Sequence, residues 1–147
     1  MKNIVKLLAV LTIFMLFTNV SNAQCKTFTK KNCLTVLEPY VFDGQLNTAI
    51  LTEGDVAELL LTLYGGQNYR ILVCGQDVLG KIEFNLYDTN RNLIYSNKDH
   101  DYINYWDFKS NSTQQLIVQV VIPKNDEVDD MMNNGCVSIL KGFKEED

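Results

Sequence analysis

The sequence predicts a mainly β protein, an antiparallel β-sandwich of jelly-roll type with about eight strands. Three observations predict this fold class. From residue 45 onward, apolar and polar residues alternate with period two in short, evenly spaced segments. Clusters of Gly, Asn, Asp and Thr separate these segments and supply turn chemistry. Only two prolines occur, and Pro123 stands at the end of a segment, where it does not interrupt a strand.

Each expected strand has its own alternation. In the second, Leu59, Leu61 and Leu63 alternate with polar neighbours, so one face is expected in the core. Gly65-Gly66 then turns the chain, and the Asp- and Asn-rich segment 88–92 forms a later turn. The expected strands are residues 45–51, 56–64, 68–74, 82–87, 93–96, 102–108, 115–122 and 136–143.

The first 23 residues have the layout of a secretory signal. Lys2 and Lys6 precede an apolar stretch over residues 7–17, and Ser21-Asn22-Ala23 is a small-x-small cleavage site. We therefore expect a signal peptide over 1–23, an N-terminal extension over 24–44 and the sandwich domain over 45–147. The expected location is secreted or periplasmic. A short helix is expected over about 32–38, because Pro39 disfavours helix in the residue before it.

Two alternatives to a cleaved signal remain open. One is a membrane anchor, but the apolar stretch is shorter than the ~20 residues that a membrane span needs, so no span is expected in the mature chain. A lipoprotein is the other alternative, because Cys25 follows the cleavage site closely. Gln24 fits poorly in front of a lipid-bearing cysteine, which disfavours this alternative.

The charge of the chain limits its partners. The formal net charge is −5, and no long run of Lys or Arg occurs, so neither nucleic acid nor an anionic membrane is expected as a partner. The chain has one histidine, which rules out a site with several histidines in one subunit.

Four cysteines in an exported chain suggest two disulfides, with three possible pairings. Alternation places Cys74 and Cys136 on the outer faces of their strands. We therefore favour Cys74–Cys136, with Cys25–Cys33 closing a small loop. The alternative is that some of these cysteines are free buried thiols.

The order of several segments resembles a known family. The segments are Gly54-Asp55 and residues 66–71, 82–88, 97–99 and 116–120. They resemble the bacterial pre-peptidase C-terminal domain, a small jelly-roll-like β-sandwich appended to secreted enzymes, and a set of small exported bacterial proteins. The glycine of the family's Asp-x-x-Gly turn is absent, with Asn90, Arg91 and Asn92 in its place. The resemblance implies the sandwich fold and export, and says little about activity.

Two acidic segments are candidate cation sites. Asp88, Asn90, Asn92 and Asp99, with Ser96 between them, have the spacing of oxygen ligands in a calcium loop. The alternative is a hairpin turn whose side chains bond their own backbone. The acidic run 126–130 is the second candidate, and its alternative is a solvated loop.

The segment 95–108 is rich in aromatic residues and is the candidate ligand site. Sugar rings stack on flat aromatic side chains, and neighbouring amides and carboxylates bond their hydroxyls. Tyr105 is the expected stacking residue, with Asn97, Asn104 and Asp107 as polar partners. The alternative is that the cluster packs in the core, with Trp106 and Phe108 on the inner face.

These observations favour an exported, non-catalytic binding or accessory module whose partner is a glycan or an envelope protein. A structural or adhesion component acting through protein contacts is the alternative. A small hydrolase is less favoured, because Asp99-His100-Asp101 has no nucleophile motif beside it.

Overall fold

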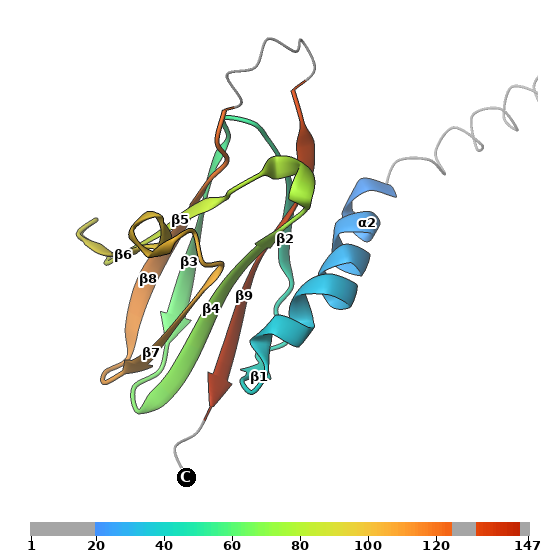
Figure 1. The fold of residues 1–147 in the computed structure, drawn as a ribbon. Coiled ribbons are helices and arrows are strands. Elements are labelled where there is room, and N and C mark those ends of the chain that lie inside the picture. Colours follow the sequence, from blue (N-terminus) through green and yellow to red (C-terminus); the bar gives the residue numbers. More distant parts are fainter. Residues whose placement is uncertain (1–19, 125–131, 145–147) are drawn as a thin grey trace, which may run out of the picture.

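A computed structural model describes residues 20–124 and 132–144. Two antiparallel sheets pack face to face, and a helical segment lies against the outer side of one of them (Figure 1). The predicted fold class, a mainly β antiparallel sandwich with an N-terminal helix, is confirmed. The acidic run 126–130 lies outside the described residues.

The larger sheet has five strands. Its path is β1 (Val41–Phe42), β9 (Asn134–Lys144), β4 (Gln67–Gly75) and β7 (Tyr105–Ser110). The fifth strand, β2 (Asn47–Thr52), pairs with the same edge of β9 as β1 does, and β9 is long enough to hold both. The edges of this sheet are therefore β7 on one side and β1 with β2 on the other.

The smaller sheet has four strands in the order β3 (Val56–Leu63), β8 (Gln114–Val121), β5 (Glu83–Tyr87) and β6 (Leu93–Ser96). Its edges are β3 and β6. Two short 3₁₀ helices, η4 (Asp77–Leu79) and η5 (Asn97–His100), connect strands of the two sheets. Seven of the eight expected strands agree with the structure to within about two residues, while β7 begins at Tyr105, later than expected.

The helical segment is longer than the sequence predicts. It comprises α2 (Val20–Phe28), η2 (Thr29–Cys33) and η3 (Leu34–Leu37). The expected end before Pro39 is correct, but the start is far earlier than residue 32. The first residues of α2 lie within the expected signal peptide, so the sequence analysis assigned them to export and not to a helix.

Two apolar clusters stabilise the fold. The main core lies between the sheets, with Tyr69, Phe84 and Leu63 among its fully buried side chains. A second cluster lies between the helical segment and the outer side of the five-stranded sheet, where Leu37 packs against Leu72 and Leu140. The outer side of this sheet is therefore a second buried surface.

The predicted disulfide pairing is wrong. The structure joins Cys25 to Cys136 and Cys33 to Cys74, and no cysteine is free. Cys25 and Cys33 lie on one helical segment, roughly 12 Å apart along its axis, which is too far for them to bridge each other. Cys74 lies opposite Ser138, two residues from Cys136, so the two sheet cysteines are only diagonal neighbours. Both do lie on the outer face, as predicted, but each bonds to the helical segment above it.

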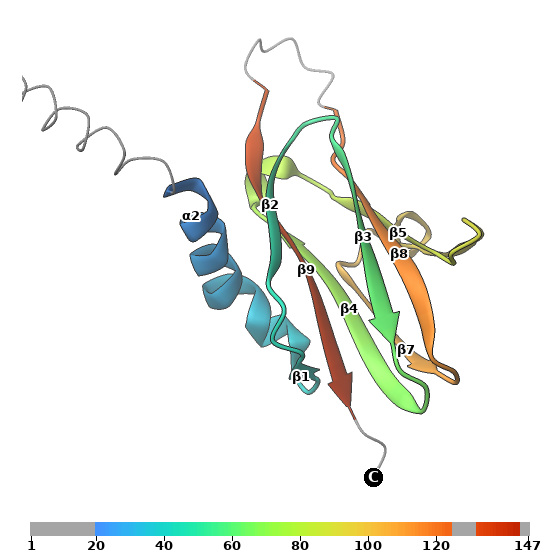
Figure 2. The same ribbon diagram turned by 180° about the vertical axis from the view of Figure 1, so that it is seen from behind.

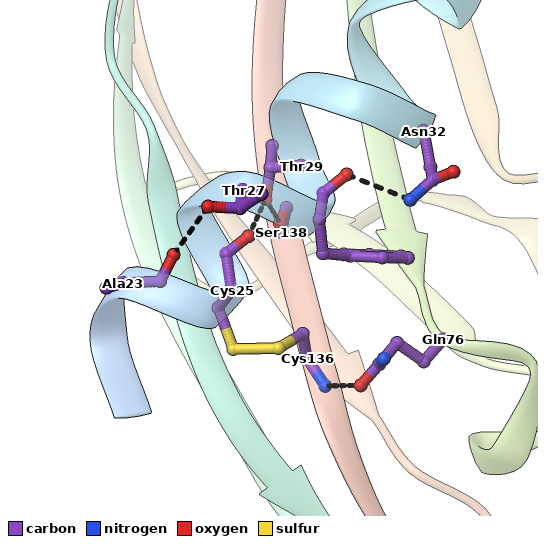
Figure 3. Close-up of a disulfide and its surroundings, with 9 residues drawn as sticks. Ala23, Cys25, Thr27, Thr29, Asn32, Gln76, Cys136 and Ser138 are labelled. Carbon is purple, nitrogen blue, oxygen red and sulfur yellow. Dashed lines mark hydrogen bonds between the residues drawn. A yellow bond between two sulfur atoms is a disulfide. The ribbon is translucent and has the colours of Figure 1, made fainter. Parts of the chain in front are cut away.

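Hydrogen bonds reinforce the attachment of the helical segment (Figure 3). The Thr29 hydroxyl donates to the carbonyl oxygen of Cys25 at 2.8 Å and shares a hydrogen bond with the buried Ser138 hydroxyl of β9. Beside the disulfide, the backbone N–H of Cys136 donates to the side-chain oxygen of Gln76 at 2.8 Å. The helix is thus fastened to β9 by covalent and polar contacts.

Candidate functional site

The two sheets differ in what packs on their outer sides. The helical segment covers the five-stranded sheet, whereas no described element packs over the outer side of the four-stranded sheet (Figure 2). Several large apolar side chains are exposed on this uncovered side. Val56 is 57% exposed, Leu60 53% and Tyr64 61%. Exposed apolar groups of this size, repeated along one face of a strand, are a feature of interaction surfaces.

The strand register arranges this surface in rows. Directly opposite residues on β5, β8 and β3 form the rows Glu83–Val121–Val56, Asn85–Gln119–Glu58 and Tyr87–Ile117–Leu60. We call these nine residues, with Thr62, Tyr64, Leu93 and Ile94, the open face. A polar row therefore separates two rows that contain apolar side chains, so a partner would meet both apolar area and fixed hydrogen-bonding groups.

The polar row is anchored by an ion pair. Arg91 donates two hydrogen bonds to the Glu58 carboxylate, each at 2.9 Å, and Gln119 donates a third at 2.9 Å. These bonds favour the charged form, so the hydrogen bond from Arg91 above all lowers the pKa of Glu58 to about 2. The carboxylate is therefore ionised throughout the neutral range and carries a fixed orientation.

An apolar cleft of about 260 Å³ lies at the side of the sandwich where β2 and β3 face each other. Its lining comprises Asn47, Thr48, Ala49, Leu51, Ala57, Glu58, Leu59, Val120, Val137 and Ile139. The cleft reaches the main core between the two sheets, because β2 and β3 belong to different sheets and do not pair.

The aromatic residues of the predicted ligand site form a stack at the opposite side of the sandwich. Trp106 lies between Phe108, at a centroid distance of 4.2 Å, and Tyr95, at 4.9 Å. His100 stacks on the far side of Tyr95 at 5.0 Å. Trp106 and Phe108 pack against the main core, as the alternative interpretation expected. Since the rings face one another, they do not form a free coplanar platform.

Tyr105 and Asp107 lie on the other face of β7, around an arginine that the sequence analysis did not single out. Arg70 donates to both carboxylate oxygens of Asp107, at 2.7 and 2.6 Å, and to the carbonyl oxygens of Val36 and Glu38. Its guanidinium lies 4.2 Å from the Tyr105 ring centroid. One face of Tyr105 is thus occupied, and the cluster ties β4 and β7 to the helical segment.

The prediction that Asn97 contacts a ligand is wrong, because its side chain is fully buried. Its side chain accepts a hydrogen bond from the backbone of Phe84 and donates to the carbonyl oxygens of Ile82 and Ile103. Asn104 is exposed, and its backbone carbonyl oxygen accepts a hydrogen bond from the backbone N–H of Val73. Of the four predicted polar and stacking residues, the structure brings only Tyr105 and Asp107 into one cluster.

The predicted calcium ligands do not converge. Asp88 accepts hydrogen bonds from the Asn92 side chain and from the backbone N–H groups of Asn92 and Asn90, and these bonds lower its pKa. Asp99 lies in η5, at the other end of the four-residue β6. A strand of that length separates the turn from Asp99 by about 13 Å. The segment 88–92 is a hairpin turn that bonds its own backbone, and the described residues include no group of three His, Cys, Asp or Glu placed to hold a metal.

Sequence reasoning missed the open face. A signal was present, because Val56 and Leu60 share the alternation phase of Glu58 and Thr62, opposite to the face expected in the core. Apolar residues on a polar face of a strand are the pattern that could have indicated a binding surface.

No family model matches this chain, and no curated protein matches it. The solved structures that match include the periplasmic inhibitor of g-type lysozyme, PliG, of Aeromonas hydrophila. It is 14% identical, covers 73% of this chain and 90% of its own, and superposes with a TM-score of 0.49. The resemblance to the pre-peptidase C-terminal domain stays a prediction. Within residues 20–124 and 132–144, no helix is long and apolar enough to cross a membrane.

Proposed function

We propose that this protein is an exported, non-catalytic binding module that docks another protein on the open face. The observation that carries the proposal is the asymmetry of the sandwich. One sheet is covered by a helical segment fixed with two disulfides, and the other leaves Val56, Leu60 and Tyr64 exposed on an ordered sheet. A rigid sheet with apolar rows and one polar row suits a protein partner, because it offers both apolar contact area and specific polar groups.

Export supports a partner in the cell envelope or outside the cell. The N-terminal signal pattern and two disulfides both fit an oxidising compartment. A glycan partner has less support, because the aromatic rings stack on one another and Arg70 covers one face of Tyr105.

A matched pair of variants tests the proposal. Leu60→Glu places a charge on the open face, whereas Val41→Glu places the same charge on the five-stranded sheet, at a residue of similar exposure (60%). Proteins captured from the exported fraction are identified and purified, and their affinities are measured by calorimetry. We expect Leu60→Glu to weaken binding by about tenfold or more and Val41→Glu to leave it within about twofold. Equal affinities for the two variants would overturn the proposal, as would sugar binding that is lost on Tyr105→Ala.

A further inference from the structure

Among residues 20–124 and 132–144, one edge of β3 has no hydrogen-bond partners along a short stretch. The carbonyl oxygen of Asp55 accepts a hydrogen bond from the backbone N–H of Ile122, which follows β8, so this carbonyl group points toward β8, while the Asp55 N–H donates to Thr52 within the turn. Successive residues of a strand point their backbone groups to alternate sides. The N–H and C=O groups of Val56, Glu58, Leu60 and Thr62 therefore point away from β8, to the edge of the sheet.

The ends of this edge are closed by other parts of the chain. The Lys141 ammonium donates to the carbonyl oxygen of Thr62 at 3.0 Å, and the backbone N–H of Tyr64 donates to the Tyr69 hydroxyl at 2.8 Å. Between these contacts and the turn at Gly54, the outward backbone groups of three residues have no hydrogen-bond partner in the described parts of the chain. The open stretch is thus Val56–Leu60.

The apolar cleft lies directly beside this open stretch. Ala57 and Leu59, which alternate with the edge residues, line it from β3, and Ala49 and Leu51 line it from β2. A strand placed along the edge would point every second side chain into the cleft and the others onto the extension of the open face. The edge and the cleft together therefore have the two features of a strand-addition site: free backbone groups and adjacent pockets for alternate side chains.

We infer that the Val56–Leu60 edge binds an extended peptide segment of another protein as an added strand, with alternate small apolar side chains in the cleft. The inference rests on the proposed function and specifies how the partner docks. Alternating backbone donors and acceptors select a polypeptide, because a lipid chain cannot bond them. The added strand is continuous with the open face, so the partner would bury the edge and the apolar rows together.

A second copy of this chain fits the edge less well. Only one antiparallel register pairs all three open residues with open residues of another copy, and it is centred on Glu58. That register brings two Glu58 carboxylates, together with the two Arg91 guanidinium groups bonded to them, to the same position of the strand pair, and like charges directly opposite destabilise such a pair.

Amide exchange on the wild-type protein is the primary test. The probe is a synthetic peptide of about eight residues in which Val alternates with Thr and Lys, compared with a scrambled peptide of the same composition. We expect the alternating peptide to slow exchange of the Glu58 and Leu60 amides by about tenfold or more, with no effect from the scrambled peptide. Unchanged exchange at both amides would overturn the inference. So would slow exchange in the free protein together with a dimer in sedimentation, since a second copy would then occupy the edge.

Two variants separate this inference from the proposed function. Glu58→Pro removes an edge donor, and Glu58→Ala removes the same side chain but keeps the donor; proline is tolerated at such edge positions. We expect peptide affinity to fall by about tenfold or more in Glu58→Pro relative to Glu58→Ala. Equal affinities would overturn the strand-addition inference. If Leu60→Glu still weakened binding of the captured protein in that case, docking on the open face would stand without it.

Discussion

Lys141 on β9 donates a hydrogen bond from Nζ to the carbonyl oxygen of Thr62 on β3 at 3.0 Å, and this bond joins the two sheets at their β2–β3 side. The same ammonium lies 3.4 Å from the Asp43 carboxylate, and the two side chains are 13% and 12% exposed. This largely buried ammonium bonds both a carboxylate and the outward carbonyl group of Thr62, and so closes one end of the open edge of β3. The open stretch of β3 therefore has a definite length.

Replacing this lysine with an apolar residue of similar size is expected to destabilise the protein. Lys141→Met leaves the Asp43 carboxylate without its cationic partner in a mostly buried position, so we expect a loss of about 2–4 kcal/mol in unfolding free energy. Denaturant melts measure the loss. Lys144→Met, at an exposed position on the same strand, is the control and is expected to change stability by less than about 0.5 kcal/mol. Equal melts of the two variants would contradict the bridging role of Lys141.

Peptide mapping of the oxidised protein is expected to recover Cys25 linked to Cys136 and Cys33 linked to Cys74. These bonds close loops of 111 and 41 residues. The chain-entropy model assigns them about 5 and about 4 kcal/mol respectively. Replacing Cys25 and Cys136 together with serine is therefore expected to lower the unfolding free energy by several kcal/mol. A peptide that links Cys25 to Cys33 would contradict the fold of the N-terminal segment.

Titration of Glu58 is expected to depend on Arg91. The pKa of Glu58 in the folded protein is about 2, below its ordinary value of 4.5. Because the folded value is the lower one, the stabilising contribution is present above about pH 4.5 and is lost as the pH falls toward 2. Arg91→Gln is expected to raise the Glu58 pKa toward the ordinary value, as followed by carboxyl NMR. Lys26→Gln, on α2, is the control, and an equal shift in both variants would argue against the local ion pair.

The strand pattern was predictable because the rule of alternation is local. Tyr69, Ile71 and Val73 face the main core, as expected, and Cys74 faces outward. Alternation states on which side of a strand a residue lies, but not what covers that side. For this reason the cysteine faces were right and their pairing was wrong: the helix that covers them begins in a stretch that the sequence assigned to export.

Polar residues were harder to place than apolar ones. The buried amide of Asn97 and the exposed side chain of Asn104 look alike in sequence, since both lie next to a strand and near aromatic residues. Arg70 stands in an apolar strand, and its partner Asp107 is its direct neighbour only after β4 and β7 pair. Long-range register, which a single sequence does not state, decides such contacts.

The two faces of β7 provide a final prediction. Trp106 packs on the main core between Tyr95 and Phe108, so Trp106→Ala removes two ring contacts together with core packing. We expect a loss of about 3 kcal/mol or more in unfolding free energy, within the range for large aromatic truncations.

On the other face, Tyr105 is half-buried beneath Arg70, and Tyr105→Ala is expected to cost about 1–2 kcal/mol through lost packing and the lost cation–π contact. Tyr105→Phe keeps the ring and is expected to change stability by less than about 0.5 kcal/mol. Paired denaturant melts measure all three variants, and emission from the single tryptophan reports the environment of Trp106 directly. Water-exposed emission, with an unchanged melt of Trp106→Ala, would reverse the assignment of the two faces. The aromatic side of the sandwich would then replace the open face as the stronger candidate for ligand binding, because a free indole face there could stack on a sugar.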